Sequence, residues 1–385
     1  MNEDSTEHRG HERLECFRSE VVDRVRESGS VWTLPGGELR LPRVFGFCRG
    51  VERALAGLEQ AVGHPPAEGG KLVLLGEVIH NPWVNDFFHD RGVHILTPAQ
   101  REDLEQYVGP RDCAIIPAFG VPLPVHRRLE AIGCEVVDST CGDVRRLWAW
   151  AERAAREGFG VAIFGRPNHD ETVVTKSRLA EAGGKYVVLR SMKRVEDFCN
   201  LLAGGDPQDR FAGTFDKDET NATSLAPFEH LAQVSQTTML YDETMEVRRR
   251  LSAALETRHG RDDLDRHALF QPTVCRATQL RQEAAVELCR SGCDLVIVVG
   301  GVGSSNTRHL FDLARKYVPA WFIEDASAIH SAEELSTFDL PGEQPIVVRD
   351  WLPRRRPLRI GVLAGASCPE IVIGRVLEKL AELLS

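Results

Sequence analysis

The chain has 385 residues, a net charge of −10 and a hydrophobic content of 42%. This length allows two or three domains, each with a core of its own. The acidic charge argues against a general nucleic-acid-binding protein, because such proteins usually present a basic face. No apolar run approaches the roughly 20 residues that cross a bilayer, and the acidic start (MNEDSTEHRGHERLECF) resembles neither a signal peptide nor a transit peptide. We therefore expect a cytoplasmic protein without membrane or nucleic-acid partners.

Short apolar runs alternate with longer amphipathic stretches along the chain, which is typical of α/β domains with mostly parallel sheets. The polar, turn-rich stretch 204–227 interrupts this alternation, and we expect a surface insertion there. Helices are predicted at 51–61, 144–156 and 279–290. In chain order, strands are predicted at 71–75, 113–116, 134–137, 160–164, 186–190, 295–299, 320–324 and 359–363.

A unit that contains a cysteine occurs three times in the chain. Cys48, Cys141 and Cys275 each follow a short apolar run and precede a helical stretch. A second strand then ends in a polar cluster, in LLGEVIHN, AIFGRPNHDE and VVGGVGSSN. A later strand ends in a polar or glycine-rich loop, in PAFGVP, QVSQTT and LAGASCP. Because open α/β sheets bind ligands at the carboxyl ends of their strands, we expect a trefoil of three α/β units around a shared centre.

The recurrence also predicts the domain boundaries. Residues 1–40 form an N-terminal extension, of which only about 12–40 look structured. The first α/β unit spans 41–141 and contains Cys48. The second spans 142–272, with Cys141 at its start, and the third spans 273–385 and contains Cys275.

Three cysteines in register favour an iron–sulfur cluster. Four cysteine thiolates usually hold a [4Fe–4S] cluster, and this chain has no compact CxxC run. One cysteine from each unit would leave one iron without a protein thiolate, and a substrate oxygen could coordinate there, just as catalytic zinc sites keep an open position. The sequence therefore predicts a [4Fe–4S] cluster that is held by Cys48, Cys141 and Cys275 and has one iron not ligated by cysteine.

Other cysteines lack this pattern. Cys113, Cys134, Cys199 and Cys289 are expected to be small buried hydrophobic residues. The CxxxC spacing that ends at Cys293 straddles a helix end and has no partner pair, so a zinc site is not favoured. The role of Cys368, beside the AGAS loop, stays open.

The polar loops suit an anion. They place hydroxyl, amide and imidazole groups at strand ends, where the helices that follow point backbone N–H groups inward. There is no Walker lysine, and GGVGSSN is neither a P-loop nor a GxGxxG motif. In NHDET, Glu171 lies close to a histidine of these loops and is the natural proton donor. The polar residues are His80, His169, Ser304, Ser305, Asn306 and Ser367.

Eight motifs in order carry a resemblance to a known family: GFCxGVxRA, GEVIHNPxVN, DSTC, HDET, QTT, CxAT, GSSN and AGAS. From about residue 20 to the C-terminus the chain resembles the 4-hydroxy-3-methylbut-2-enyl diphosphate reductases, and PAFG and HDETVVT resemble their cyanobacterial and plant-type branch. The resemblance implies a three-domain α/β trefoil. It also implies the last step of the methylerythritol phosphate pathway of isoprenoid synthesis, a reductive dehydroxylation that gives isopentenyl and dimethylallyl diphosphate.

The resemblance further implies roles for individual residues. Glu171 would supply protons, with His169 as the next candidate, and Thr237 would orient the leaving hydroxyl. Electrons would arrive one at a time from a ferredoxin or flavodoxin, and the oligomeric state stays open. The residues that would hold the diphosphate substrate are His80, His169, Thr237, Thr278, Ser304, Ser305, Asn306 and Ser367.

Two positions depart from the family pattern. Phe119 stands where many bacterial members have histidine, and Gly142 stands where proline, which favours a first helical turn, is usual. Two alternatives also remain. Quinolinate synthase resembles a three-cysteine trefoil as well, but the GSSN and AGAS loops favour the reductase. A non-catalytic cluster sensor would not need Glu171 and Thr237.

Overall fold

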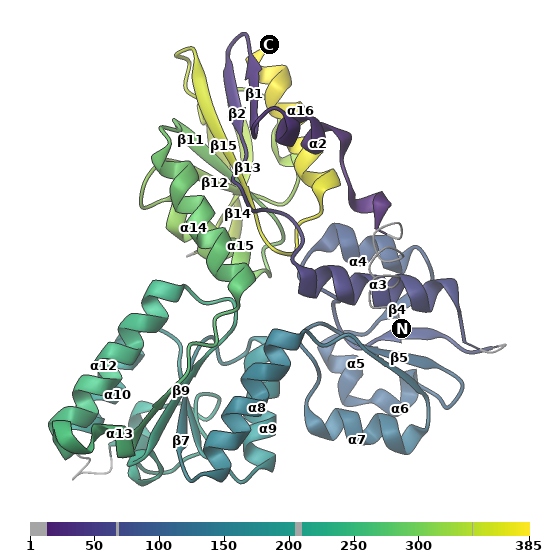
Figure 1. Cartoon of the computed structure of the whole chain (residues 1–385). Helices are drawn as coiled ribbons and strands as arrows, with labels where there is room; N and C mark the ends of the chain where they lie inside the picture. Colours follow the sequence, from purple (N-terminus) through teal and green to yellow (C-terminus); the bar gives the residue numbers. More distant parts are fainter. Residues whose placement is uncertain (1–13, 67–68, 205–209, 341) are drawn as a thin grey trace, which may run out of the picture. The chain divides into compact units, whose positions relative to one another are not determined.

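The computed structural model describes residues 14–66, 69–204, 210–340 and 342–385 (Figure 1). The start of the predicted N-terminal extension and residues 205–209 of the predicted insertion lie outside this range. The chain divides into two compact units. Unit 1 comprises Met1–Pro65, Glu77–Ile95 and Arg276–Ser385, and unit 2 comprises Pro66–Gly76 and Leu96–Cys275.

Unit 1 is built on a five-stranded sheet in the order β1-β2-β15-β11-β12. The strands β2, β15, β11 and β12 run parallel, and β1 joins β2 as an antiparallel hairpin. Their bounds are β1 (Val31–Leu34), β2 (Gly37–Arg40), β11 (Leu295–Val299), β12 (Ala320–Ile323) and β15 (Leu358–Ala364).

The sequence of β11, LVIVV, explains how this sheet is covered. Its odd-numbered residues pack with α2 (Glu20–Glu27) and α16 (Glu370–Leu384). Val296 and Val298 lie on the other face and pack with α14 (Arg276–Arg290) and α15 (Ser305–Ala314). A strand that is buried on both faces needs a continuous apolar run rather than an alternating one.

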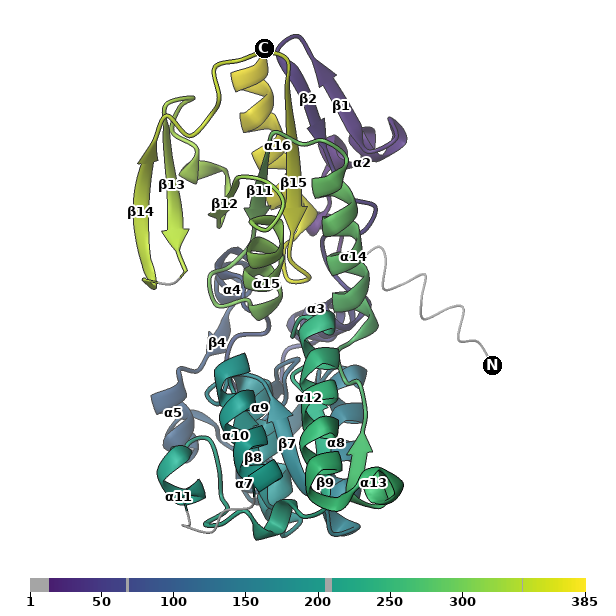
Figure 2. The ribbon, with the colours of Figure 1, turned by 90° about the vertical axis from the view of Figure 1, so that its left-hand side faces the viewer.

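Unit 1 also contains an antiparallel hairpin of β13 and β14, which Figure 2 shows beside the main sheet. The sequence analysis missed this hairpin, because β14 is exposed along most of its length and carries no alternating pattern. The remaining elements of the unit are η1 (Glu15–Phe17), α3 (Arg49–Gly63), α4 (Pro82–His89), β4 (Val93–Ile95), η4 (Ala326–Ala328), β13 (Glu334–Asp339) and β14 (Gln344–Arg349).

Unit 2 contains two parallel arrangements, β3-β5-β6 and β10-β9-β7-β8. Its strands are β3 (Leu72–Leu74), β5 (Cys113–Ile116), β6 (Glu135–Asp138), β7 (Gly160–Phe164), β8 (Tyr186–Leu189), β9 (Leu231–Ser235) and β10 (Ala268–Phe270). Its helices are α5 (Pro98–Glu102), α6 (Leu104–Tyr107), α7 (Leu123–Ile132), α8 (Gly142–Arg156), α9 (Asp170–Glu181), α10 (Met192–Gly204), α11 (Phe211–Thr214), η2 (Ala226–Phe228), α12 (Tyr241–His259), η3 (Arg261–Asp263) and α13 (Leu264–His267).

The sheet around β7 is also buried on both faces. Side chains of α8 and α9 pack against one face, and side chains of α10 and α12 pack against the other. The eight predicted strands and three predicted helices all overlap elements of the structure. The predicted α/β class with mostly parallel sheets is therefore confirmed.

Two parts of the chain are packed more closely than the sequence suggested. Within the described part of the predicted insertion, Phe211 and Phe215 lie in the core of unit 2, and the fully buried Glu219 forms an ion pair with Arg190 at 3.0 Å. Polar residues separate these apolar positions in the sequence and hide the pattern. Within the described part of the predicted N-terminal extension, β2 pairs with β15 in the sheet of unit 1.

The sequence repeat has a structural counterpart in three parallel triplets: β3-β5-β6, β7-β9-β10 and β11-β15-β2. In each triplet the central strand leads into the PAFG, QVSQT or LAGAS loop. One neighbour leads into a polar motif, and the other precedes a cysteine. The sequence repeat therefore corresponds to these triplets, and each cysteine follows a strand that flanks the central one: β2 precedes Cys48, β6 precedes Cys141 and β10 precedes Cys275.

Candidate active site

The three predicted cluster ligands share one backbone arrangement. Each lies immediately before a helix, at the start of α3, α8 or α14. The backbone N–H of Cys48 donates to the Ala366 carbonyl at 3.4 Å, within unit 1. In unit 2, the N–H of Cys141 donates to the Ala118 carbonyl at 2.9 Å, and that of Cys275 donates to the Thr237 carbonyl at 3.0 Å.

These hydrogen bonds follow from the strand order. Each cysteine comes after a strand that pairs in parallel with the central strand of its triplet, so the cysteine reaches the loop that follows the central strand. The same contact thus recurs at LAGAS, PAFG and QVSQT. All three thiols are partly exposed and free of disulfides.

Of the four cysteines that were expected to be buried, Cys113 and Cys289 are buried, whereas Cys134 and Cys199 are only partly buried. Cys293 and Cys368 are buried as well. Burial raises the pKa of Cys113 to about 11 and that of Cys289 to about 12, and it raises the pKa of the fully buried Cys368 still further. These thiols stay protonated at neutral pH, whereas metal ligation needs a thiolate.

Unit 1 gathers most of the predicted anion-binding residues into one polar cluster. The amide of Asn306 connects them: its nitrogen donates to Thr278 Oγ1 at 3.1 Å, and its oxygen accepts from the Ala366 N–H at 3.3 Å. The hydroxyl of Ser367 donates to Ser304 Oγ at 3.3 Å. These side chains are at most 7% exposed. The unit 1 polar cluster comprises His80, Thr278, Ser304, Ser305, Asn306 and Ser367.

Close backbone approach shapes this cluster. A Cβ added to Gly301 would lie 2.4 Å from the carbonyl oxygen of His80, so only glycine fits beside that residue. The Ser304 hydroxyl accepts from the N–H of Thr307 and caps α15, which leaves the start of this helix directed at the cluster. The imidazole of His80 is held by Glu77, whose carboxylate lies 2.7 Å from Nδ1.

Unit 2 contributes a buried carboxyl group to the predicted site. Glu171, in the first turn of α9, is fully buried. Thr237 approaches it twice: its backbone N–H donates to Oε1 at 2.6 Å, and its hydroxyl donates to Oε2 at 2.5 Å. The loop after β9 therefore fixes the carboxyl that the sequence analysis selected as the proton donor.

Burial dominates the acidity of this carboxyl. Loss of hydration raises the pKa of Glu171 from 4.5 to about 7, although the hydrogen bonds from Thr237 lower it, and the nearby charge of Asp143 raises it further. A carboxyl with a pKa near neutrality can both hold and release a proton at physiological pH.

His169 begins the same helix. It is 9% exposed, and its Nδ1 accepts the backbone N–H of Glu171 at 3.2 Å as the cap of α9. The structure thus brings Glu171, Thr237 and His169 together in unit 2, and Thr237 also contacts Cys275 through the backbone. Of the eight residues predicted to bind the diphosphate, His169 and Thr237 lie in unit 2 and the other six in unit 1.

Three residues of these regions were missed by the sequence analysis. The carboxylate of Glu77 orients the imidazole of His80, and the negative charge of Asp143 helps to raise the pKa of Glu171. The buried Gln236 accepts the N–H of Arg166 at 3.2 Å and donates to Thr238. Glu77 and Gln236 stand inside the GEVIH and QTT motifs, and Asp143 stands two residues after Cys141, so their positions carried a usable signal.

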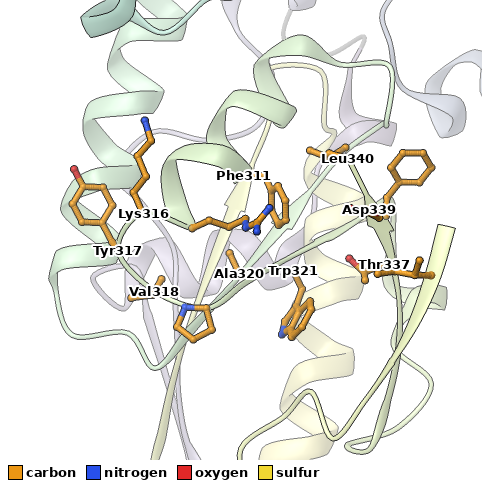
Figure 3. Close-up of a pocket in the computed structure, with 13 residues that line it drawn as sticks. Phe311, Lys316, Tyr317, Val318, Ala320, Trp321, Thr337, Asp339 and Leu340 are labelled. Carbon is orange, nitrogen blue, oxygen red and sulfur yellow. The ribbon is translucent and has the colours of Figure 1, made fainter. Parts of the chain in front are cut away.

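A separate cavity of about 480 Å³ lies in unit 1 (Figure 3). Its walls come from the end of α15, from β12 and from the β13–β14 hairpin, and they include Phe311, Tyr317 and Trp321. None of the predicted site residues lines it. The site predicted from the repeated motifs is therefore not this cavity.

Two general searches cover the described residues only. Among them, no group of three or more His, Cys, Asp or Glu side chains is arranged to hold a metal ion. Of the helices in the same ranges, none combines the length and the apolar character needed to cross a membrane.

Comparison with known families gives a consistent match. A family model described as LytB protein matches residues 39–381. The 4-hydroxy-3-methylbut-2-enyl diphosphate reductase of Thermosynechococcus vestitus is 32% identical over 96% of this chain and 90% of its own length. The enzyme of the same name from Synechococcus sp. (strain ATCC 27144) is 34% identical over 96% of this chain and 91% of its own length. These relatives are cyanobacterial, which agrees with the predicted branch.

Two solved structures show the same fold. A structure of (E)-4-hydroxy-3-methyl-but-2-enyl diphosphate reductase covers 89% of this chain at a TM-score of 0.55 and 23% identity, and 99% of that chain is matched. The E-1-hydroxy-2-methyl-but-2-enyl-4-diphosphate reductase from Plasmodium falciparum covers 90% at a TM-score of 0.62 and 20% identity, with 88% of that chain matched. The match confirms the predicted trefoil class of the fold.

Proposed function

The chain belongs to the LytB protein family, an oxidoreductase family of diphosphate reductases that use an iron–sulfur cluster, and we propose that it reduces 4-hydroxy-3-methylbut-2-enyl diphosphate to isopentenyl and dimethylallyl diphosphate. The observation that carries this proposal is the shared arrangement of the three cysteines. Cys48, Cys141 and Cys275 are partly exposed, lie at helix starts and are bound through their N–H groups to equivalent loops.

The donor chemistry of these cysteines fits a [4Fe–4S] cluster. Thiolates are its natural ligands, and the partial positive charge of a helix N-terminus favours a thiolate over a thiol. We propose that Cys48, Cys141 and Cys275 hold the cluster. When bound, such a cluster supplies single electrons and one Lewis-acidic iron that lacks a cysteine ligand. A ferredoxin or flavodoxin, both one-electron carriers, would be the donor that matches this chemistry.

The unit 1 polar cluster suits the diphosphate. Its hydroxyl and amide groups are already hydrogen-bonded to one another and face the start of α15, so little reorganisation is needed when an anion arrives. His80, fixed by Glu77 through Nδ1, can present Nε2 to a phosphate oxygen. In unit 2, His169 presents its Nε2 in the same way, because its Nδ1 is occupied by the helix cap.

Glu171 and Thr237 suit the removal of the hydroxyl group. With its pKa raised to about 7, a large share of Glu171 is protonated at neutral pH and can donate to a departing hydroxide, which then leaves as water. The Thr237 hydroxyl, 2.5 Å from Oε2, can turn to orient the substrate oxygen beside this proton. In this assignment Glu171 delivers the proton, and His169 together with the unit 1 polar cluster binds the diphosphate.

An anaerobic assay tests the proposal. The iron-loaded protein is incubated with 4-hydroxy-3-methylbut-2-enyl diphosphate and a reduced viologen dye, and the products are separated by chromatography. We expect consumption of the dye together with formation of both isomeric diphosphates. A protein that contains a full complement of cluster iron but leaves the substrate unchanged would contradict the proposed function. That result would favour the alternative, a non-catalytic cluster sensor.

A further inference from the structure

Phe119 makes a contact that the family pattern does not explain. The ring of Phe119 lies against the imidazole of His169 in unit 2, with ring centroids 5.5 Å apart and planes inclined at 79°. This edge-to-face geometry is the preferred arrangement of two aromatic rings. A phenylalanine therefore stands beside a histidine that has a proposed part in binding the diphosphate.

The loop that carries Phe119 has little freedom. Gly120 has a φ of +79°, and a Cβ at that position would lie 2.3 Å from the ring of Trp148. On the other side, the Ala118 carbonyl accepts the N–H of Cys141. Because both neighbouring residues are held in place, the ring of Phe119 stays packed against the imidazole of His169.

The hydrogen bond at Nδ1 determines what His169 can offer. Because Nδ1 accepts the N–H of Glu171 at 3.2 Å, the neutral ring carries its proton on Nε2. Rotation of the ring by half a turn would place a carbon at the helix cap and take the Nε2–H group away from its present direction. The ring of Phe119, which packs against the imidazole, opposes that rotation.

We propose that Phe119 is a positioning residue that holds the imidazole of His169 as an Nε2–H donor to the substrate diphosphate; this rests on the proposed function of His169. The side chain of Phe119 has no polar group with which to bind the diphosphate directly. It contributes by keeping a neighbouring donor in one orientation, which gives a reason for an apolar ring at a position where many members carry histidine.

A double-mutant cycle tests this proposal by binding. The dissociation constant of the substrate is measured on oxidised, cluster-loaded protein, which does not turn over without a reductant, for wild type, Phe119→Leu, His169→Asn and the double variant. Asparagine keeps a good helix cap but removes the imidazole. We expect Phe119→Leu to weaken binding about tenfold, near the upper end of what one aromatic contact contributes. In the His169→Asn background the same change should have no further effect.

Three further variants separate positioning from general packing. Phe119→Tyr keeps the ring and should restore binding to within about twofold of wild type, whereas Phe119→Met fills the space without a ring and should behave like Phe119→Leu. Phe159→Leu is the matched control, because Phe159 makes a similar edge contact with His230 at 5.8 Å and 72° in the same unit. This control should leave the dissociation constant unchanged.

The possible outcomes distinguish a failure of the Phe119 proposal from a failure of the proposed role of His169. Equal effects of Phe119→Leu with and without His169, or no effect of both Phe119→Leu and Phe119→Met, would overturn the positioning role and leave the proposed function intact. If His169→Asn binds the substrate as tightly as wild type, the proposed role of His169 fails, and the inference about Phe119 fails with it. In kinetic assays the positioning role requires KM to rise while kcat stays within about twofold.

Discussion

The unit 1 polar cluster and the Glu171 region of unit 2 are both buried and polar, but they differ in charge. The cluster around Asn306 and Ser304 consists largely of hydroxyl and amide groups, whose donors remain available at any physiological pH. Glu171, by contrast, has a pKa of about 7 and changes its protonation state within that range. Similar burial therefore serves two purposes: fixed neutral donors suit the binding of an anion, and an ionisable group suits proton transfer.

The proposed cluster ligands come from both units, and two of them are bonded to loops beside the two polar regions. Cys48 is bound to the loop next to the unit 1 polar cluster, and Cys275 is bound through its backbone to Thr237, the partner of Glu171.

The largest expected effect follows from replacing these cysteines. Cys48→Ser, Cys141→Ser and Cys275→Ser should each remove most of the cluster and nearly all turnover, because serine is a poor ligand for cluster iron. Iron and sulfide content and visible absorption of anaerobically purified protein measure the loss. Cys289→Ser is the control, since the Cys289 thiol is buried and stays protonated, and it should retain both. Full cluster occupancy in Cys141→Ser would exclude Cys141 as a cluster ligand.

The second effect isolates the Glu171 region. Glu171→Gln keeps the shape of the side chain but cannot supply an acidic proton, so we expect kcat to fall by about 10²–10⁴-fold while the cluster and the substrate dissociation constant change little. Stopped-flow turnover and calorimetric binding measure the two quantities. Glu219→Gln, which alters another fully buried carboxylate of unit 2, is the matched control. A near-normal kcat in Glu171→Gln would transfer the proton donor to another group, with His169 first.

A third change isolates the unit 1 polar cluster. Asn306→Ala removes the amide that connects Thr278 with the LAGAS loop. Loss of a hydrogen bond to a charged group costs about 1.5–3 kcal/mol, which corresponds to a rise in KM of roughly 10–150-fold with kcat largely retained. Asn221→Ala, which removes a structural amide bonded to Gly184, should leave KM unchanged. A fall in kcat with an unchanged KM would contradict a binding role, because it would place Asn306 in the chemical step as Glu171 is.

The smallest effect is on stability. The pKa of Glu171 is raised on folding, so the folded protein binds this proton more tightly than the unfolded chain. Its contribution to the free energy of unfolding is fully present below pH 4.5 and is lost as the pH rises through about 7. Glu171→Gln cannot titrate, so its stability should decline less than that of wild type between pH 5 and pH 8, as denaturant titrations can measure. A parallel decline in both proteins would indicate an ordinary pKa for Glu171.

The sequence predicted those parts of the molecule whose physical cause is local. Strands such as β11 were recognised because burial on both faces demands an unbroken apolar run. Cys48, Cys141 and Cys275 were selected because they recur before helices, and the structure does place each of them directly before a helix. The burial of Glu171 follows from its position at the start of α9 against the loop after β9, a contact that the sequence analysis did not predict.

Features that depend on distant contacts were missed. The segment around Phe211 and Phe215 looked like an insertion because its apolar residues acquire a common face only after the chain has turned. The N–H bonds of the three cysteines arise from the order of strands, and no side chain encodes them. The contact of Phe119 with His169 joins loops after two different strands, so the sequence could show the departure at Phe119 but not its neighbour.

The central claim, that cysteines from both units hold one cluster with an iron open to substrate, is tested most directly by Mössbauer spectroscopy of ⁵⁷Fe-enriched, oxidised protein before and after addition of 4-hydroxy-3-methylbut-2-enyl diphosphate. We expect one [4Fe–4S] cluster per chain in which a single iron differs from the other three, and we expect only that iron to change its parameters when the substrate binds. Four equivalent irons that do not respond to the substrate would contradict the claim.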